Sequence, residues 1–428
     1  MYTPFRDKKE NPIEIANLYY RHLCQLVDID EGYKIEYKET FDATVKKKIP
    51  AIMSSFANSD GGWLFVGIED AEHKITPIPK LRSDYSQTIS QILKSTVSPI
   101  PKFDCKFITN PKNKKEGVLA IYTYAGNFTP YVCNGTIYIR NGSSKEPIKS
   151  ERSTIEFLYK KAEKFKTEID RFCKREIYFP YTQERFGEKR RDYAICNIYL
   201  KKISKEGARV IRTMSDIESL NNYLQNKDSP YKSMQSSQQS VTFWHHPINP
   251  LKNDITMVWE IFYDLSMKFH IPISISPDYR SYVMLQFEKD GFEITESAHI
   301  FDGLISHNAV FSSLSEACSL LGVYGEQIND YALCMEIEDC ENSILYFRGE
   351  IFRNYIKDHG LKFACKPQVK SDVWFLSDAD MKWTDIPLTA TYRFFDSSFG
   401  LLSKVFDEMH QEAMKLEFPE FYLNEKND

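Results

Sequence analysis

The stretch Ser55-Phe-Ala-Asn-Ser-Asp-Gly-Gly-Trp-Leu-Phe-Val-Gly-Ile-Glu-Asp70 contains a helix end, a tight turn and a buried strand. Before and within it, apolar residues recur at helical spacing and predict a helix that begins near Pro50: Ile49, Ile52, Met53 and Phe56. Asn58-Ser59-Asp60-Gly61-Gly62 is a dense turn signal. The apolar run Trp63–Ile68 predicts a strand inside a sheet, and Asp70 follows where that strand leaves the sheet.

Strand and helix signals alternate on both sides of this stretch. The segments with strand character are Tyr33–Lys38, Phe103–Thr109, Val118–Tyr124 and Thr136–Arg140. The segments with helical spacing are Ser86–Val97 and Glu151–Arg175. Mixed order and short connections predict an α+β domain with a small mixed sheet over residues 15–176.

The rest of the chain carries weaker signals. Residues 177–191 contain Pro180 and the basic cluster at 189–191, and they are expected to form a connector. Residues 192–428 are expected to form a C-terminal α+β region that selects the substrate, forms oligomers or acts as a sensor. Strand character is found in Asp192–Lys201, Tyr282–Phe287 and Phe292–Ile300, and helical character in Ser312–Leu321 and Leu401–Met414.

Composition excludes several classes of protein. The chain has 428 residues, 42% hydrophobic and 27% charged, which excludes global disorder and collagen-like structure. No run approaches the roughly 20 apolar residues of a membrane span, and the first residues lack the apolar core of a signal peptide. Nine cysteines without CxxC spacing argue against a disulfide framework, so the expected location is the cytoplasm.

Charge is distributed unevenly along the chain. Residues 1–180 carry 29 Lys and Arg against 23 Asp and Glu, a balance of +6. The remainder carries 26 against 37, a balance of −11. A basic front half can face phosphate groups, and oppositely charged halves are consistent with a homodimer. A monomer with an acidic second domain stays an alternative.

The residues with the strongest chemical signal are Glu36 and Lys38. On a strand, positions i and i+2 share a face, which places this carboxylate beside this ammonium group. Taken alone, the pair also fits an ordinary solvent-facing strand. Asp70 at the end of the neighbouring strand can converge with Glu36 on Mg²⁺ or Mn²⁺, which prefer oxygen ligands. Glu31 has the wrong parity for the same strand face, so it would have to reach in from the turn at Gly32.

Three segments together resemble the AlbA-2 domain of the Schlafen family. They are Glu31–Lys38, Ser55–Asp70 and Thr136–Ser144, the last of which is similar to the final strand of that domain and its Arg-x-Gly-Ser turn. The resemblance covers about residues 15–165. It implies a nuclease whose metal ligands are Glu31, Glu36 and Asp70.

The resemblance also implies a substrate class. Several Schlafen proteins are metal-dependent endoribonucleases that cut tRNA and rRNA, and bacterial members act in defence against phage. Animal members carry two related lobes and a zinc site, and this sequence shows one lobe and no matching cysteine–histidine cluster. The sequence gives no indication of which phage or host molecule would trigger the activity.

The resulting hypothesis is a metal-dependent endoribonuclease that acts on structured RNA such as tRNA. Glu31, Glu36, Lys38 and Asp70 are the expected catalytic residues. The residues expected to hold flanking phosphates are Lys46, Lys47, Lys48, Arg140, Ser143 and Ser144. Two alternatives stay open. One is a non-catalytic nucleic-acid-binding regulator, and the other is an interaction or sensor protein with a vestigial nuclease domain.

Overall fold

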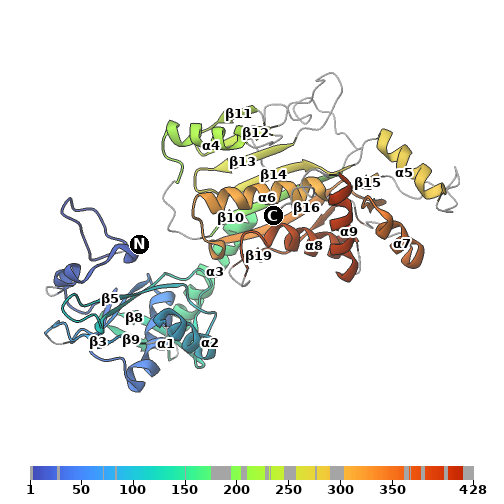
Figure 1. Cartoon of the computed structure of the whole chain (residues 1–428). Coiled ribbons are helices and arrows are strands. Elements are labelled where there is room, and N and C mark those ends of the chain that lie inside the picture. The colour runs from blue at the N-terminus through green and yellow to red at the C-terminus, as the bar shows by residue number, and fades with distance from the viewer. Residues whose placement is uncertain are drawn as a thin grey trace. The chain divides into compact units, whose positions relative to one another are not determined.

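The chain forms two compact units, Met1–Arg171 and Phe172–Asp428 (Figure 1). The structure is a computed structural model. It describes residues 3–26, 29–70, 72–81, 84–149, 151–174, 194–203, 210–226, 231, 233–244, 257–274, 277–289, 303–360, 366, 368–376, 381–399 and 403–417. The expected connector, 177–191, lies outside these ranges. Mixed helices and sheets confirm the predicted α+β class.

The first unit contains a small mixed sheet and a second, smaller sheet. Its elements are β1 (Ile35–Lys38), α1 (Ala43–Asn58), β2 (Gly62–Val66), β3 (Ile78–Pro79), α2 (Tyr85–Thr96), β4 (Val97–Ser98), β5 (Phe103–Thr109), β6 (Glu116–Thr123), β7 (Val132–Cys133), β8 (Thr136–Asn141), β9 (Ser144–Pro147) and α3 (Arg152–Phe172). The main sheet has the order β1-β2-β6-β3, with β5 also paired to β6. The smaller sheet has the order β4-β7-β8-β9.

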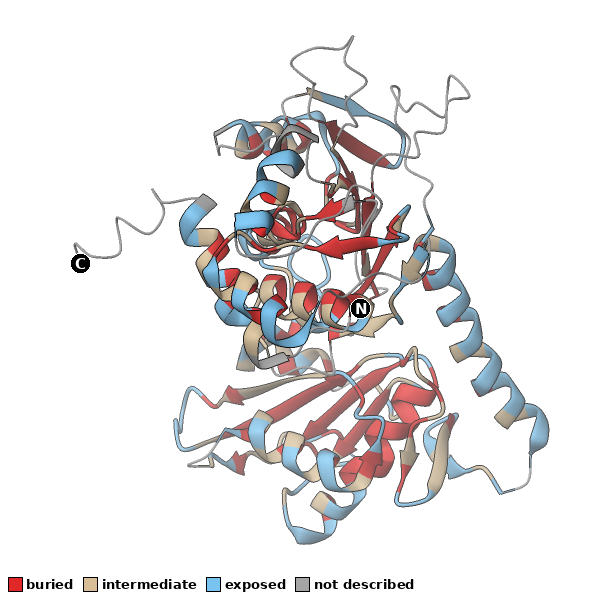
Figure 2. Ribbon diagram, turned by 90° about the vertical axis from the view of Figure 1, so that its right-hand side faces the viewer, coloured by how far each residue is buried: buried red, intermediate tan, exposed pale blue. Residues whose placement is uncertain are grey.

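The two faces of the main sheet are covered by different parts of the chain. Helices α1 and α2 pack on the face that carries Leu64 and Val66. Residues from the N-terminal segment, including Phe5 and Leu23, pack on the face that carries Trp63 and Phe65. Buried strands therefore run between two apolar layers (Figure 2). Because Phe5 is fully buried in this layer, the packed unit begins before residue 15.

Helix α1 begins at Ala43, seven residues before the predicted start at Pro50. Asp42 caps it, since its carboxylate accepts hydrogen bonds from the backbone N–H groups of Thr44 and Val45 at 2.7 and 2.8 Å. Pro50 lies inside the helix, so the predicted start was wrong. The missed signal was the Asp42 cap, which marks a helix start independently of proline.

The turn after α1 is fixed by an asparagine and two glycines. The Asn58 side chain donates to the carbonyl oxygens of Tyr131 and Tyr138 at 2.9 Å and accepts from the backbone N–H of Tyr131 at 2.7 Å. Gly61 has a φ of +75°, and a Cβ on Gly62 would meet the Phe56 ring at 2.3 Å. The sequence Asn58–Gly62 thus ties the end of α1 to β7 and β8 and admits β2 directly after it.

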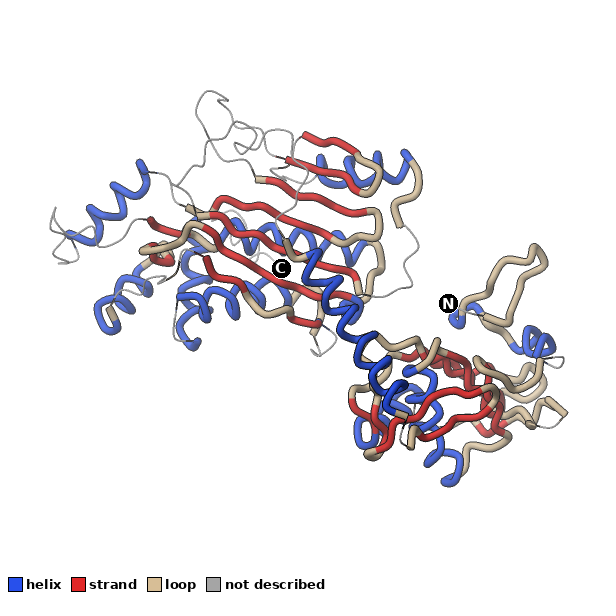
Figure 3. Tube along the Cα trace, turned by 180° about the vertical axis from the view of Figure 1, so that it is seen from behind, coloured by secondary structure: helices blue, strands red, loops and turns tan. Residues whose placement is uncertain are grey.

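The second unit is a broad antiparallel sheet with helices on one face (Figures 1 and 3). Its elements are β10 (Ile195–Lys202), α4 (Met214–Asn226), β11 (Ser233–Ser236), β12 (Ser240–Trp244), β13 (Val258–Phe262), β14 (Met267–Pro272), α5 (Pro277–Lys289), β15 (Gly303–Ile305), α6 (Asn308–Val323), β16 (Tyr331–Glu338), β17 (Ser343–Leu345), α7 (Glu350–His359), β18 (Gln368–Lys370), β19 (Trp374–Phe375), α8 (Ile386–Phe399) and α9 (Ser403–Glu417). The order is β11-β12-β13-β14-β10-β16-β18, with β19 also paired to β16. Helices α6, α8 and α9 supply much of the apolar core against it.

Predictions for the back half met mixed results. The helices predicted at Ser312–Leu321 and Leu401–Met414 are confirmed as α6 and α9. The strand predicted at Asp192–Lys201 is confirmed as β10. Tyr282–Phe287 was predicted as a strand and is part of helix α5, so that prediction was wrong. Residues 292–300 lie outside the described ranges. None of the helices in the described part of the chain is both long and apolar enough to cross a membrane.

Candidate active site

Strand β1 places Glu36 and Lys38 on one face of the main sheet. It pairs in parallel with β2, with Glu36 opposite Leu64 and Lys38 opposite Val66. Tyr37, between them, points to the opposite face, where it packs with Phe65. The alternation predicted for Glu36 and Lys38 is therefore present, and their face is the one covered by α1.

Glu36 is a buried carboxylate held by two cations. Its Oε2 accepts a hydrogen bond from Arg140 Nη1 at 2.7 Å, and its Oε1 lies 2.9 Å from Lys38 Nζ. Burial alone would raise the pKa of Glu36, but Arg140 and Lys38 outweigh burial and hold the pKa below its usual value. Glu36 is thus ionised, and its charge is neutralised within the protein.

Glu31 enters the same site from the turn before β1. Its Oε1 accepts a hydrogen bond from the backbone N–H of Tyr37 at 2.7 Å and lies 3.6 Å from Lys38 Nζ. Burial, the charge of Glu36 and a hydrogen bond with Asp70 raise the pKa of Glu31 to about 7, against the opposing effects of Tyr37 and Lys38. Glu31 therefore reaches the site from the turn before β1, as the parity of its position required.

Asp70 completes a cluster of three carboxylates around Lys38. It follows β2 and lies on the surface, next to Glu31. Burial alone would lower the pKa of Lys38, but Glu36, Glu31 and Asp70 together raise it. The four residues predicted to be catalytic therefore interact with one another, from β1, the turn before it and the loop after β2.

The carboxylates suit a divalent ion in chemical type. Mg²⁺ and Mn²⁺ prefer carboxylate oxygens and keep several waters, so few protein ligands are needed. Glu31 and Asp70 are the clearest pair, because a hydrogen bond between them places the two carboxyl groups side by side, where a cation could replace the shared proton. Both Glu36 oxygens contact cations. Among the described residues, no group of three or more His, Cys, Asp and Glu side chains is arranged to hold a metal.

The three lysines of α1 have different surroundings. The Lys46 ammonium lies over the Phe41 ring, 4.7 Å from its centre. Lys47 is exposed. Lys48 lies near Asp42 and near Lys145 of β9. The capping hydrogen bonds lower the pKa of Asp42, and the charge of Lys48 lowers it further. Of the three, Lys48 is the one that influences Lys145, a residue that the charge of Glu36 also reaches.

Arg140 is placed differently from the sequence expectation. Its side chain is fully buried, its Nη1 contacts Glu36, and its Nη2 donates to the carbonyl oxygens of Gly32 and Ser143 at 2.7 and 2.9 Å. Its guanidinium lies over the Phe56 ring at 4.7 Å. Arg140 therefore holds Glu36 and the surrounding backbone and does not face solvent phosphate. Ser143 and Ser144, in the turn after it, are exposed.

Sequence reasoning missed Lys145. It lies directly opposite Arg140 in the β8–β9 hairpin and is half-buried. Burial, and the charges of Lys38, Lys48 and Arg140, lower the pKa of Lys145 against the opposing effect of Glu36. The signal that would have found it is the hairpin itself, because a turn at Gly142 pairs Arg140 with the residue after Ser144.

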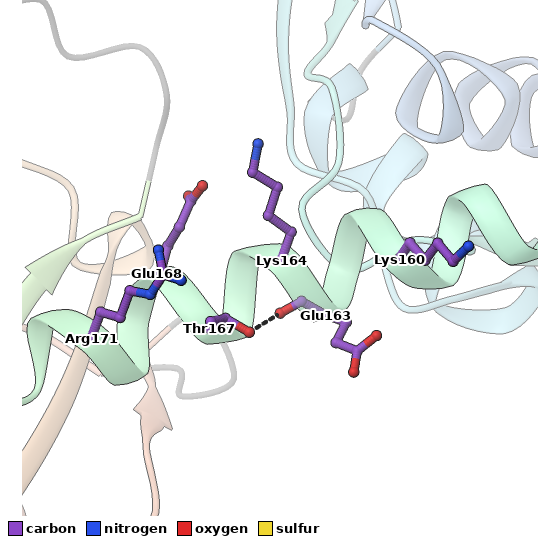
Figure 4. A pocket seen from close by; sticks show the side chains of 6 residues that line it. All are labelled: Lys160, Glu163, Lys164, Thr167, Glu168 and Arg171. Atoms are coloured by element: carbon purple, nitrogen blue, oxygen red, sulfur yellow. Dashed lines mark hydrogen bonds between the residues drawn. The ribbon is translucent and has the colours of Figure 1, made fainter.

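A shallow pocket lies on the exposed side of α3, away from these residues in the sequence. Figure 4 shows its lining, which comes from a single helix: Lys160, Glu163, Lys164, Thr167, Glu168 and Arg171. The Thr167 hydroxyl donates to the Glu163 backbone carbonyl at 2.9 Å. Cations and carboxylates alternate along it and none of the clustered carboxylates lines it, so it is not part of the candidate site.

Comparison with known families gives a match within the first unit. The family model "Schlafen, AlbA_2" matches residues 31–149. These residues form a Schlafen AlbA_2 domain. The domain match contains Glu31, Glu36, Lys38, Asp70 and the β8–β9 hairpin. The Schlafen family is associated with nuclease activity, which agrees with the carboxylate-rich site of this domain.

Individual relatives match over a short segment. The Poxin-Schlafen proteins of monkeypox virus and of cowpox virus (strain Brighton Red) are 28% identical to the chain over 75 residues. That match covers 15% of this chain, which spans 15% of the length of those relatives. The solved structure of the DIP2311 protein from Corynebacterium diphtheriae is similar with a TM-score of 0.22 and 22% identity, over 27% of this chain and 22% of the other.

Proposed function

We propose that the AlbA_2 domain is a metal-dependent endoribonuclease that cleaves structured RNA, with tRNA as the expected substrate, in defence against phage. One observation supports it above all: the charges of Glu36, Glu31 and Asp70 all raise the pKa of Lys38. A protein that only binds nucleic acid gains nothing from three carboxylates near a phosphate. A hydrolase uses such carboxylates to hold a cation and to move protons.

The residues of the chain divide the chemistry between them. Lys38 places a positive charge where negative charge develops on the phosphate in the transition state. Glu31, with a pKa of about 7, can take a proton from water or return one to a leaving oxygen near neutral pH. Glu36, fixed by Arg140, orients Lys38. Burial does most to raise the Glu31 pKa, and a hydrogen bond with Asp70 adds to it.

Glu31 and Asp70, with Glu36 adjacent, are the residues that would hold Mg²⁺ or Mn²⁺. A bound ion supplies charge stabilisation and lowers the pKa of a water. Glu31 must lose its proton to serve as a ligand, so metal binding and the protonation of Glu31 compete.

RNA is favoured as substrate by the mode of recognition that the surface permits. The cations near the site are suited to backbone phosphates, contacts that position a substrate without reading its sequence, and recognition by shape and backbone suits folded RNA. The test is incubation of a tRNA pool and of duplex DNA with Mg²⁺ or Mn²⁺, and then with EDTA. Cleavage of tRNA that EDTA abolishes supports the proposal, and cleavage of duplex DNA alone contradicts it.

A non-catalytic nucleic-acid-binding regulator is the second candidate, and one observation favours it. Both oxygens of Glu36 are occupied by Lys38 and Arg140, which leaves that carboxylate neutralised without any ion. In a binding module, this arrangement would fix the β8–β9 hairpin. Such a module binds tRNA without shortening it in any of the metal conditions above.

For the second unit we propose a role in substrate selection, sensing or self-association, with a homodimer as the expected state. The basis is the balance of +6 over residues 1–180 and −11 over the remainder. Light scattering at micromolar concentration, with and without tRNA, tests it. Twice the monomer mass of 50.1 kDa is expected, and a monomer in both conditions contradicts it.

A further inference from the structure

Four cationic side chains from four elements gather beside the carboxylate cluster. They are Lys38 of β1, Lys48 of α1, Arg140 of β8 and Lys145 of β9. Helix α1 packs against both β8 and β9, and the charge of Lys48 on α1 is felt at Lys145 on β9. Besides burial, the charges of Lys38, Lys48 and Arg140 each lower the pKa of Lys145. The four charges therefore influence one another across a small region.

Two of the four cations are engaged within the protein. Arg140 is held by Glu36 and two backbone carbonyl oxygens, and Lys38 contacts Glu36. Neither Lys48 nor Lys145 forms an ion pair within the described part of the chain. Their positive charges are thus available to an anion from outside.

Lys145 occupies a position that is unfavourable for a positive charge without a bound anion. Like charges directly opposite each other on paired strands destabilise a sheet, and Arg140 and Lys145 are such a pair. Glu36 compensates Arg140 and also attracts Lys145, but partial burial and repulsion from three cations outweigh that attraction at Lys145 and lower its pKa. An anion bound here would remove that repulsion.

We propose that Lys145 and Lys48 bind a backbone phosphate of the RNA next to the one that is cleaved. This inference rests on the proposed function for the identity of the ligand. Their ammonium groups would hold the chain of the substrate while Lys38 acts at the scissile phosphate. The exposed Ser143 and Ser144 lie at the same end of the hairpin and border this position.

The experiment measures tRNA binding in EDTA, so that it does not depend on cleavage. Lys145→Ala and Lys48→Ala should each weaken binding about tenfold, as loss of a charged hydrogen bond does. Each should also make the salt dependence shallower by about one released ion. The double variant should lose less than the product of the two, because both lysines hold one phosphate.

Further variants separate this role from a structural one. Lys145→Arg keeps the charge and should restore binding to within about threefold. Lys94→Ala removes an exposed lysine of α2 from the same domain and should bind as the wild type does. Lysine acetylation mapped by mass spectrometry should show Lys145 protected by tRNA, which reports directly on the position even if Lys145→Ala folds poorly.

With active enzyme, Lys145→Ala should raise KM about tenfold and change kcat by less than threefold, since the contact is made before the transition state. Unchanged tRNA affinity and salt slope in Lys145→Ala, or acetylation of Lys145 unaffected by tRNA, would overturn the assignment. A wild type that binds tRNA through Lys145 but never cleaves it would refute the nuclease and leave the phosphate site standing.

Discussion

Arg140 and Glu36, 104 residues apart in the sequence, form a buried ion pair with a hydrogen bond of 2.7 Å. The pair joins β8 of the smaller sheet to β1, the edge strand of the main sheet that also carries Lys38. It fixes the carboxylate from one side, and Lys38 contacts it from the other. The geometry of the site therefore depends on a residue that never meets solvent.

Removal of Arg140 should destabilise the first unit strongly. Arg140→Met leaves the Glu36 charge buried with Lys38 as its remaining partner, and breaking a buried pair in this way costs about 3–5 kcal/mol. Urea unfolding followed by tryptophan fluorescence measures the loss, with Trp63 reporting from the first unit and the other four tryptophans from the second. Arg152→Ala breaks an exposed pair with Glu156 and should cost less than about 0.5 kcal/mol. Equal losses in the two variants would contradict the role given to Arg140.

Glu31→Gln should stabilise the protein in a pH-dependent way. Because the folded pKa of Glu31 is raised to about 7 from 4.5, the unfolded chain loses this proton first. Stability of the wild type then falls as pH rises from about 4.5 to 7, and the variant escapes this loss. A gain of about 1–3 kcal/mol at pH 8 and none at pH 4 is expected from urea titrations. A constant difference at all pH values would refute the raised pKa.

Mn²⁺ should raise the melting temperature of the wild type more at pH 8 than at pH 5.5. At the lower pH Glu31 holds its proton, and protons compete with the ion. Asp70→Asn should lose most of the shift at pH 8, whereas Glu69→Gln, next to it in the chain, should keep it. Differential scanning fluorimetry provides the measurement. A shift that Asp70→Asn retains in full would place the ion elsewhere.

Lys38→Met should slow cleavage more than it weakens binding. Its charge matters most where negative charge develops on the phosphate, and loss of one such group costs about 10²-fold or more in kcat. Single-turnover cleavage and tRNA affinity in EDTA separate the two effects. Lys80→Met removes an exposed lysine after β3 as the matched control. A loss confined to affinity would make Lys38 a binding residue.

The sequence predicted the parts of the fold that local signals determine. Phe103–Thr109 is a strand with those bounds, and the helices near Ser86 and Glu151 and the strand after Gly62 lie where periodicity placed them. Local signals do not determine which distant segments pair. The partner of Glu36 comes from β8, and the direction in which Arg140 points depends on the hairpin, so Arg140 was expected to meet phosphate.

The same limit explains the error in the second unit. Tyr282–Phe287 is a short, largely apolar run in which Val283 and Phe287 are buried on one face of helix α5, and short apolar runs do not distinguish a strand from a helix. Lys145 was missed for a related reason, because a single lysine gains meaning only from its cross-strand partner. Glu31, Glu36, Lys38 and Asp70 were found because they lie at or near the ends of two adjacent strands.

The most direct test of the central claim is cleavage of a tRNA transcript in Mn²⁺ by the wild type, Asp70→Asn, Glu36→Gln and Glu69→Gln. The wild type and Glu69→Gln are expected to cleave. The other two variants are expected to lose at least about 10²-fold in rate, with tRNA binding in EDTA retained. Full cleavage by Asp70→Asn, or no cleavage by the wild type with any divalent ion, would contradict it.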